Sequence, residues 1–83
     1  MKKLQDKPER VEVMALFGYE MTPCQPLSFK RSGGKEVEVT ELLATRIKFE
    51  GTTAIHIFDV VANQRKCRLE FNGKSLAWDV ATY

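Results

Sequence analysis

The sequence has few of the residues that usually mark a metal centre or a secreted scaffold. It contains two cysteines, Cys24 and Cys67, which lie far apart, and one histidine, His56. A disulfide-stabilised domain of this size carries more cysteines, so we expect two free thiols in a reducing compartment. A structural zinc site needs four ligands, usually in two close pairs, and these three residues do not provide them. We therefore expect no metal and no cofactor.

Long apolar runs and a dominant charge are also missing. No run approaches the roughly 20 apolar residues that a membrane-spanning helix needs. Met1 to Pro8 begins with two lysines, as signal peptides do, but Gln5, Asp6 and Lys7 replace the apolar region that should follow. The chain has 13 Lys and Arg against 11 Asp and Glu, so net charge favours neither nucleic acid nor a membrane surface as partner. We expect a cytoplasmic protein without a membrane partner.

What the chain does contain is a series of short runs in which apolar and polar residues alternate. The clearest pair lies at the end, where the apolar members are Cys67, Leu69 and Phe71, then Leu76, Trp78 and Val80. Alternation with a period of two predicts strands with one buried face. Asn72-Gly73 separates the two runs, and this dipeptide favours a type I′ turn, in which both central residues have positive φ. The sequence therefore predicts a β-hairpin here.

The first half of the chain predicts two further strands. Val11, Val13, Ala15 and Phe17 favour a strand near residues 10–19, although its second half is apolar on both faces and a helix is the alternative. The prolines at 23 and 26 predict a loop over residues 22–26. Leu27 and Phe29 mark a second strand, and Ser32-Gly33-Gly34-Lys35 predicts a hairpin turn after it.

The middle of the chain predicts an irregular sheet. Val37, Val39, Leu43, Ile47 and Phe49 share one face, whereas Leu42 and Ala44 lie on the other. A β-bulge near Glu41-Leu42 explains this pattern, and a single helical turn over residues 40–44 is the alternative. Turns are expected at residues 51–53 and 63–65, with a second irregularity near Asp59.

These segments predict an all-β fold of about six antiparallel strands in a meander. The 83 residues suffice for one small domain, residues 10–83, after a flexible N-terminal segment, residues 1–9. No long helix is available to cover an open sheet, so a strongly bent sheet or a small barrel is expected, in which the sheet packs against itself.

Catalytic residues are not evident. Ser32-Gly33-Gly34-Lys35 lacks the hydroxyl residue and the helix that follow a phosphate-binding loop. His56 is the single candidate for proton transfer near neutral pH, and its position between Ile55 and Ile57 predicts that it points outward. Nothing in the spacing aligns a nucleophile or an acid with it. We therefore expect a protein that is not an enzyme.

A basic surface is the sharpest candidate site. Its members are five residues in two groups: Arg46, Lys48, Arg65, Lys66 and Arg68. Small barrels bind single-stranded nucleic acid with such residues beside aromatic side chains. Glu50 and Glu70 lie among these bases and weaken the field, since binding scales with the phosphates that are neutralised.

Several short motifs occur in an order that resembles a known family. They are Pro26-Leu27-Ser28-Phe29, Gly34-Lys35, Val37 to Val39, Leu43, Arg68-Leu69-Glu70-Phe71 and Trp78. This order is similar to that of small uncharacterised bacterial β-domain proteins, mostly Gram-positive. Some of these domains of unknown function are associated with Y-family, error-prone DNA polymerases. The resemblance implies a compact β-domain without established catalysis and a role linked to DNA repair or nucleic acid.

Two functions follow as hypotheses. The first is a non-enzymatic accessory domain that binds a protein partner, or a second copy of itself, through a sheet edge or face. The first strand and the strand that leads to Tyr83 are the expected edges. The alternative is a single-stranded nucleic-acid-binding accessory protein that uses the five bases. Their clustering on one face would favour the alternative.

Overall fold

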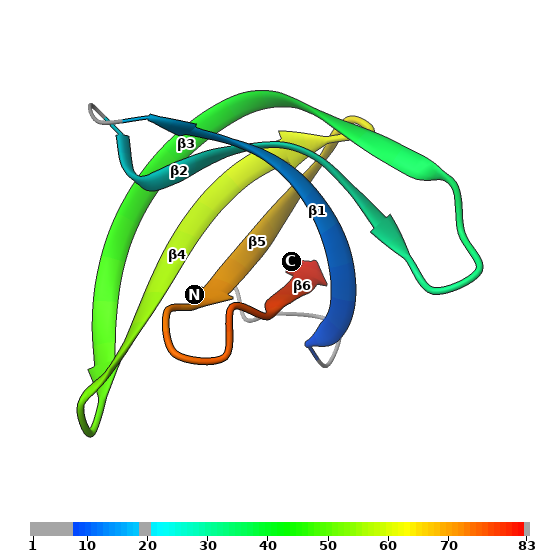
Figure 1. The fold of residues 1–83 in the computed structure, drawn as a ribbon. Helices are drawn as coiled ribbons and strands as arrows, with labels where there is room; N and C mark the ends of the chain where they lie inside the picture. The colour runs from blue at the N-terminus through cyan, green and yellow to red at the C-terminus, as the bar shows by residue number, and fades with distance from the viewer. Residues whose placement is uncertain (1–7, 19–20, 83) are drawn as a thin grey trace.

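Six β-strands form the described part of the chain, residues 8–18 and 21–82, in this computed structural model; for residues 21–23 the description covers the backbone alone. The strands are β1 (Glu9–Gly18), β2 (Met21–Arg31), β3 (Glu36–Glu50), β4 (Thr53–Ala62), β5 (Arg65–Asn72) and β6 (Trp78–Thr82). They form an antiparallel meander, and β1 also pairs with β6, which closes the sheet into a small barrel (Figure 1). The predicted all-β fold class is confirmed.

An aromatic cluster fills the barrel where it closes. The Trp78 ring centroid lies 5.6 Å from that of Phe58 and 4.8 Å from that of Phe71. Trp78 also pairs with Val11 of β1, so the first and last strands meet over this cluster. Burial of such rings supplies much of the stability of a small domain, because each removes a large apolar area from water. We call this side of the sheet the interior face and the opposite side the outer face.

Ion pairs reinforce the junction of β1 with its two neighbours. Arg10 Nε lies 2.9 Å from Asp79 Oδ1 on β6, and Arg31 of β2 lies 2.6 Å from Glu9 Oε1. The pairing of β1 with β6 covers three residue pairs, Glu9–Val80, Arg10–Asp79 and Val11–Trp78. Because exposed ion pairs contribute at most about 1 kcal/mol each, the aromatic cluster is the main contribution to closure.

The predicted bulge in the middle of the chain is confirmed. The register between β3 and β4 shifts twice, between Val39 and Glu41 and between Leu42 and Ala44. Leu42 thereby packs against the core, while Ala44 pairs with Asp59 on the outer face. The helical turn considered for residues 40–44 does not form, because this stretch is part of β3. The bulges bend β3, which arches over the barrel in Figure 1.

Two local predictions need correction or qualification. The loop expected at residues 22–26 is wrong, because β2 runs through both prolines. β1 is a strand and not a helix, although Tyr19, its expected end, lies outside the described residues. Prolines are tolerated in β2 because, over this stretch, pairing joins it to β1 on one side and not to β3 on the other.

The turns occur at the positions that the sequence predicts, but their types differ in part from the prediction. Gly33 and Gly51 have positive φ in the expected turns after β2 and β3. The type I′ prediction at Asn72-Gly73 is wrong, because neither residue has positive φ. Instead the Asn72 side chain accepts hydrogen bonds from the amides of Lys74 and Ser75, in a longer turn. The positive φ pair of a tight hairpin occurs at Asn63 and Gln64, between β4 and β5.

Replacement of Trp78 by alanine should reduce the free energy of unfolding by about 3–5 kcal/mol, because the ring leaves a cavity between Phe58 and Phe71. Urea denaturation followed by circular dichroism measures the change. Leu76→Ala is the control, since Leu76 is 68% exposed and its replacement should matter little. Equal midpoints for the two variants would contradict the proposed core.

Candidate interaction surfaces

The structure brings four of the five predicted bases to the outer face. On β3, Arg46 lies opposite Ile57 and Lys48 opposite Ile55, whereas on β5 Lys66 and Arg68 lie opposite Val61 and Asp59. Arg65 takes an interior register position, opposite Ala62, at the exposed start of β5. Strand pairing therefore joins into one surface two basic groups that are separated by about twenty residues of sequence.

Acidic side chains neutralise much of this basic surface. Asp59 is 7% exposed and lies between two guanidinium groups, with Arg46 3.2 Å from Oδ2 and Arg68 3.3 Å from Oδ1. Lys48 lies 3.6 Å from Glu50 on the same strand. Because these carboxylates occupy the bases, the surface attracts phosphates less than its count of Arg and Lys indicates.

Asp59 lies beside an irregularity that the sequence predicts. An irregularity was expected near this residue, because Phe58, Val60 and Val61 break the alternation of apolar and polar residues. The β3–β4 register does shift between the partners of Val60 and Asp59, although the extra residue lies on β3 and the pairing of β4 with β5 is continuous. Phe58, Asp59 and Val60 are all buried, since the arginines cover Asp59 on the outer face while the core covers its neighbours.

His56 was assigned to the wrong face. It lies opposite Phe71 on the interior face, with ring centroids 6.1 Å apart, while Ile55 and Ile57 occupy the outer face. The sequence suggested the reverse, because two isoleucines normally mark the interior. Arg46 and Lys48 lie directly opposite these isoleucines on the outer face, and long side chains of this kind shield apolar neighbours with their aliphatic stems. His56 Nδ1 is buried and has no hydrogen-bond partner among the described residues.

The longest free sheet edge in the described chain lies on β3. The edge expected at β1 occurs over residues 12–18, since β1 pairs with β6 at residues 9–11 alone. The edge expected at the strand that leads to Tyr83 does not occur within the described residues, since β6 pairs with β1 and β5; Tyr83 itself lies outside them. On the β2 side, by contrast, β3 pairs at three positions, residues 36–38. Within the described chain no strand pairs with residues 39–50 of β3 on that side.

Apolar side chains accompany this edge. Ile47 is 49% exposed and Phe49 is 69% exposed, although register places both on the interior face, opposite His56 and Ala54. Leu43, in the second bulge, is 44% exposed. Ile47 and Phe49 are exposed because the β3–β4 hairpin extends past the rest of the barrel, at the lower left of Figure 1. Three large apolar side chains beside an unpaired edge form the candidate site, which we call the β3 edge site (residues 39–50).

The sequence pattern does not indicate the β3 edge site, because alternation predicts that Leu43, Ile47 and Phe49 lie on the buried face. One signal was present. The prolines at 23 and 26 each lack the N–H that a strand needs to pair with neighbours on both sides. Because β2 already pairs with β1 over this stretch, its prolines make additional pairing with β3 unfavourable. Part of β3 is therefore left without a partner.

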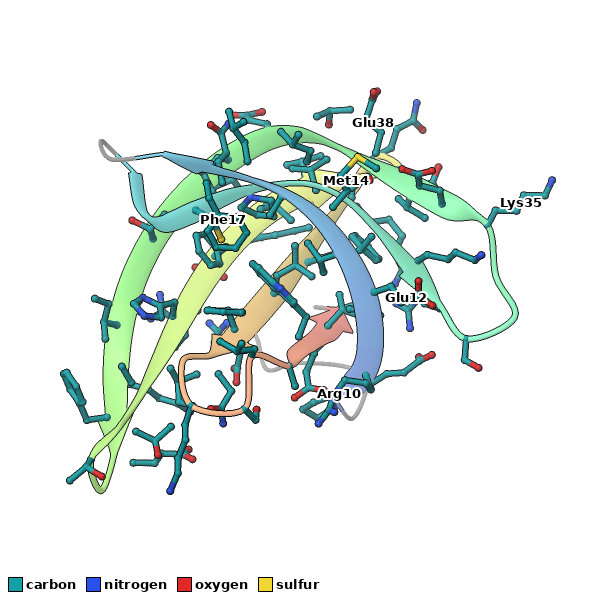
Figure 2. The ribbon with its side chains drawn as sticks, in the orientation of Figure 1. Arg10, Glu12, Met14, Phe17, Lys35 and Glu38 are labelled. Atoms are coloured by element: carbon teal, nitrogen blue, oxygen red, sulfur yellow. The ribbon has the colours of Figure 1, made fainter. Side chains whose placement is uncertain are left out.

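A second surface, on the outer face of β1–β3, has a shallow groove of 480 Å³. Met14, Ser28 and Glu36 line it, and Met14 is 62% exposed. Figure 2 shows Met14 and Glu38 on the same side of the sheet. At its base, Ser28 Oγ donates a 2.6 Å hydrogen bond to Glu36 Oε2. This bond already satisfies the polar groups best placed to bind a ligand, so the β3 edge site is the stronger candidate.

The cysteines lie in the interior, and neither forms a disulfide. Burial raises the pKa of the Cys24 thiol. Burial likewise raises the pKa of Cys67, while Arg31 and Arg65 lower it to a smaller extent. Both thiols thus behave as small core side chains. Among the residues described, no three His, Cys, Asp or Glu side chains are placed to hold a metal ion, and no helix is long and apolar enough to cross a membrane.

Replacement of Asp59 by asparagine should strengthen the binding of mixed-sequence single-stranded DNA, because Arg46 then loses its carboxylate partner and becomes available to phosphates. One added contact should steepen the dependence of log K on log salt by about 0.7. Fluorescence anisotropy at several salt concentrations measures the slope. Glu12→Gln, which removes a negative charge from β1, is the control. Unchanged slopes would show that Arg46 does not face a nucleic-acid groove.

The buried thiols should make the fold less stable at high pH. Their pKa is raised in the folded state, so above the ordinary thiol pKa of about 8.5 the unfolded chain loses these protons first. The contribution is therefore complete below that pH and is lost as pH rises through the folded-state values. Urea denaturation from neutral pH to about pH 10 measures it. A Cys24→Ala, Cys67→Ala variant should lose stability less steeply, and an identical slope would contradict the assignment.

Comparisons with known proteins give no relative. No family model matches the chain, no curated protein matches it, and no solved structure matches its fold. The resemblance to polymerase-associated β-domains stays a prediction. Function is therefore inferred from the geometry of this chain's own residues.

Proposed function

We propose that this protein is a non-enzymatic accessory domain that binds an extended segment of another polypeptide along the β3 edge site. The observation that carries this proposal is the unpaired side of β3 over residues 39–50, next to the exposed side chains of Ile47 and Phe49. A strand with unpaired N–H and C=O groups is a template for another strand, and edge pairing is a common mode of peptide recognition.

The composition of β3 supports this role. Residues 39–50 contain no proline and no glycine, so every residue whose backbone points away from β4, about every second one, can offer both a donor and an acceptor at the free edge. The stretch of β2 from which β3 diverges contains prolines at 23 and 26, and is a poorer template. Of the two diverging edges, β3 is therefore the one suited to accept a strand.

The apolar side chains would supply affinity to the backbone pairing. A strand docked on β3 places every second side chain on the interior face, next to Ile47 and Phe49. Burial of apolar area contributes about 25 cal/mol per Å².

An enzyme has less support from this geometry. The immediate cross-strand neighbours of His56 are Ile47 and Phe71, which cannot act as nucleophile, acid or orienting group. The hypothesis of single-stranded nucleic-acid binding is also weaker, because Arg46 and Arg68 hold Asp59 and Lys48 contacts Glu50. Neither alternative accounts for the unpaired edge.

Selection of random peptides displayed on phage against the immobilised full chain tests the proposal. Enriched peptides, made synthetically, should shift backbone amide signals of residues 39–50 in ¹⁵N-labelled protein and slow hydrogen exchange there. Binding should weaken about tenfold or more in an Ile47→Lys, Phe49→Lys variant, since each tenfold corresponds to about 1.4 kcal/mol of lost apolar burial.

Met14→Lys is the matched control, because Met14 is an equally exposed apolar residue on the outer face of β1. It should leave affinity unchanged. Failure to enrich any peptide, or enriched peptides whose signals map to the Met14 groove, would contradict binding at the β3 edge site.

A further inference from the structure

We infer that the segment bound by the β3 edge site carries apolar and acidic side chains in alternation. This inference rests on the proposed function and adds the chemistry of the partner. After the second bulge, β3 alternates regularly from Ala44 to Glu50. Thr45, Ile47 and Phe49 lie on the interior face, and Arg46 and Lys48 lie on the outer face. A docked strand therefore meets an apolar row on one face and a basic pair on the other.

The basic pair remains accessible despite its internal contacts. The side chains of Arg46 and Lys48 are 50% and 49% exposed, while Asp59, which Arg46 contacts, is 10% exposed. Glu50 partly balances Lys48 at the end of the strand. Between Ala44 and Lys48, however, the outer face of β3 itself carries positive charge alone. Opposite charges on directly paired strands are favourable, so glutamate or aspartate suits the positions opposite Arg46 and Lys48.

The same charges disfavour a second copy of this chain as the occupant in two of the three central registers. Full antiparallel overlap of residues 44–50 with their counterparts centres on Ile47 and sets Arg46 opposite Lys48 twice. A shift by one residue pair in one direction sets Arg46 opposite Arg46, whereas the shift in the other direction sets Lys48 opposite Lys48 and Arg46 opposite Glu50 twice. Like charges directly opposite each other destabilise a strand pair. A different chain with acidic residues avoids this repulsion in every one of these registers.

Three capped heptapeptides test the inference against the full ¹⁵N-labelled chain. The first alternates valine with glutamate, the second replaces each glutamate by lysine, and the third groups the same valines and glutamates into two blocks. At low salt the alternating acidic peptide should bind about tenfold more tightly than the lysine peptide, with shifts in residues 39–50, and added salt should reduce the difference. The block peptide should bind more weakly than the alternating one.

A charge reversal provides the decisive comparison. Lys48→Glu should invert the preference, so that the lysine peptide binds more tightly than the acidic one. Lys48 is chosen because Arg46 also holds the buried Asp59. Lys35→Glu is the control with the same change in net charge, and Lys35 lies in the β2–β3 turn at the far end from the β3–β4 hairpin (Figure 2). Lys35→Glu should keep the original preference.

The outcomes separate the two proposals. Equal binding of the acidic and lysine peptides, with shifts in residues 39–50, would overturn the acidic partner and leave edge binding intact. Shifts elsewhere, or none with any peptide, would count against edge binding itself. A dimer of the free chain, found by light scattering and abolished by Ile47→Lys, would identify a second copy as the occupant and overturn the inference.

Discussion

The rest of the fold depends on the contact between β1 and β6 at Val11 and Trp78. A six-stranded sheet without a covering helix must bury its apolar face against itself, and it can do so only if its first and last strands meet. They meet over three residue pairs, with Trp78 packed against Phe58 and Phe71 beneath the junction. A ladder of three residue pairs gives the closed barrel little stability by itself, so the aromatic contacts are the main interaction that keeps β1 and β6 together. The Arg10–Asp79 ion pair fixes the register of that ladder more than it adds stability.

The barrel closes between β1 and β6, and in doing so it leaves most of β2 and β3 apart. β3 has 15 residues and β2 has 11, yet they share three pairs near the β2–β3 turn. The two bulges bend β3 so that it follows β4 along its whole remaining length and leaves β2. This separation sacrifices few hydrogen bonds at the prolines of β2, because proline has no N–H to donate to a neighbouring strand. The β3 edge site is thus a consequence of how the barrel closes, which explains why its apolar side chains lie on the interior face and are still exposed.

The sequence predicted the features that depend on local pattern. The alternation of apolar and polar residues predicted the strands and the meander. Apolar residues on both faces near Leu42 correctly indicated a bulge, because the extra residue of a bulge moves the following side chains to the opposite face. Predictions failed where a distant strand decides the outcome. The prolines at 23 and 26 indicate a loop in isolation but fit a strand with one free side. Likewise, His56 occupies the interior because strand register outweighs the hydrophobicity of Ile55 and Ile57. The exposure of Ile47 and Phe49 depends on where β2 diverges, and the prolines of β2 are the one signal of that divergence, since nothing in the pattern of β3 itself indicates it.

An exposed edge exposes a protein to indiscriminate strand pairing, and β3 has features that limit it. Bulges interrupt the first part of the free stretch, and charged side chains at Glu41, Arg46, Lys48 and Glu50 oppose many partners. These features restrict pairing without preventing it, since the charges lie on the outer face and leave the backbone and the apolar row accessible. Asp59 adds to this selectivity by fixing Arg46 in place from the neighbouring strand. A fixed positive charge discriminates between partners better than a mobile one, because less side-chain entropy is lost when an acidic residue pairs with it. In the proposed function, the buried carboxylate that weakens the case for nucleic acid would thus help the edge to select a complementary strand.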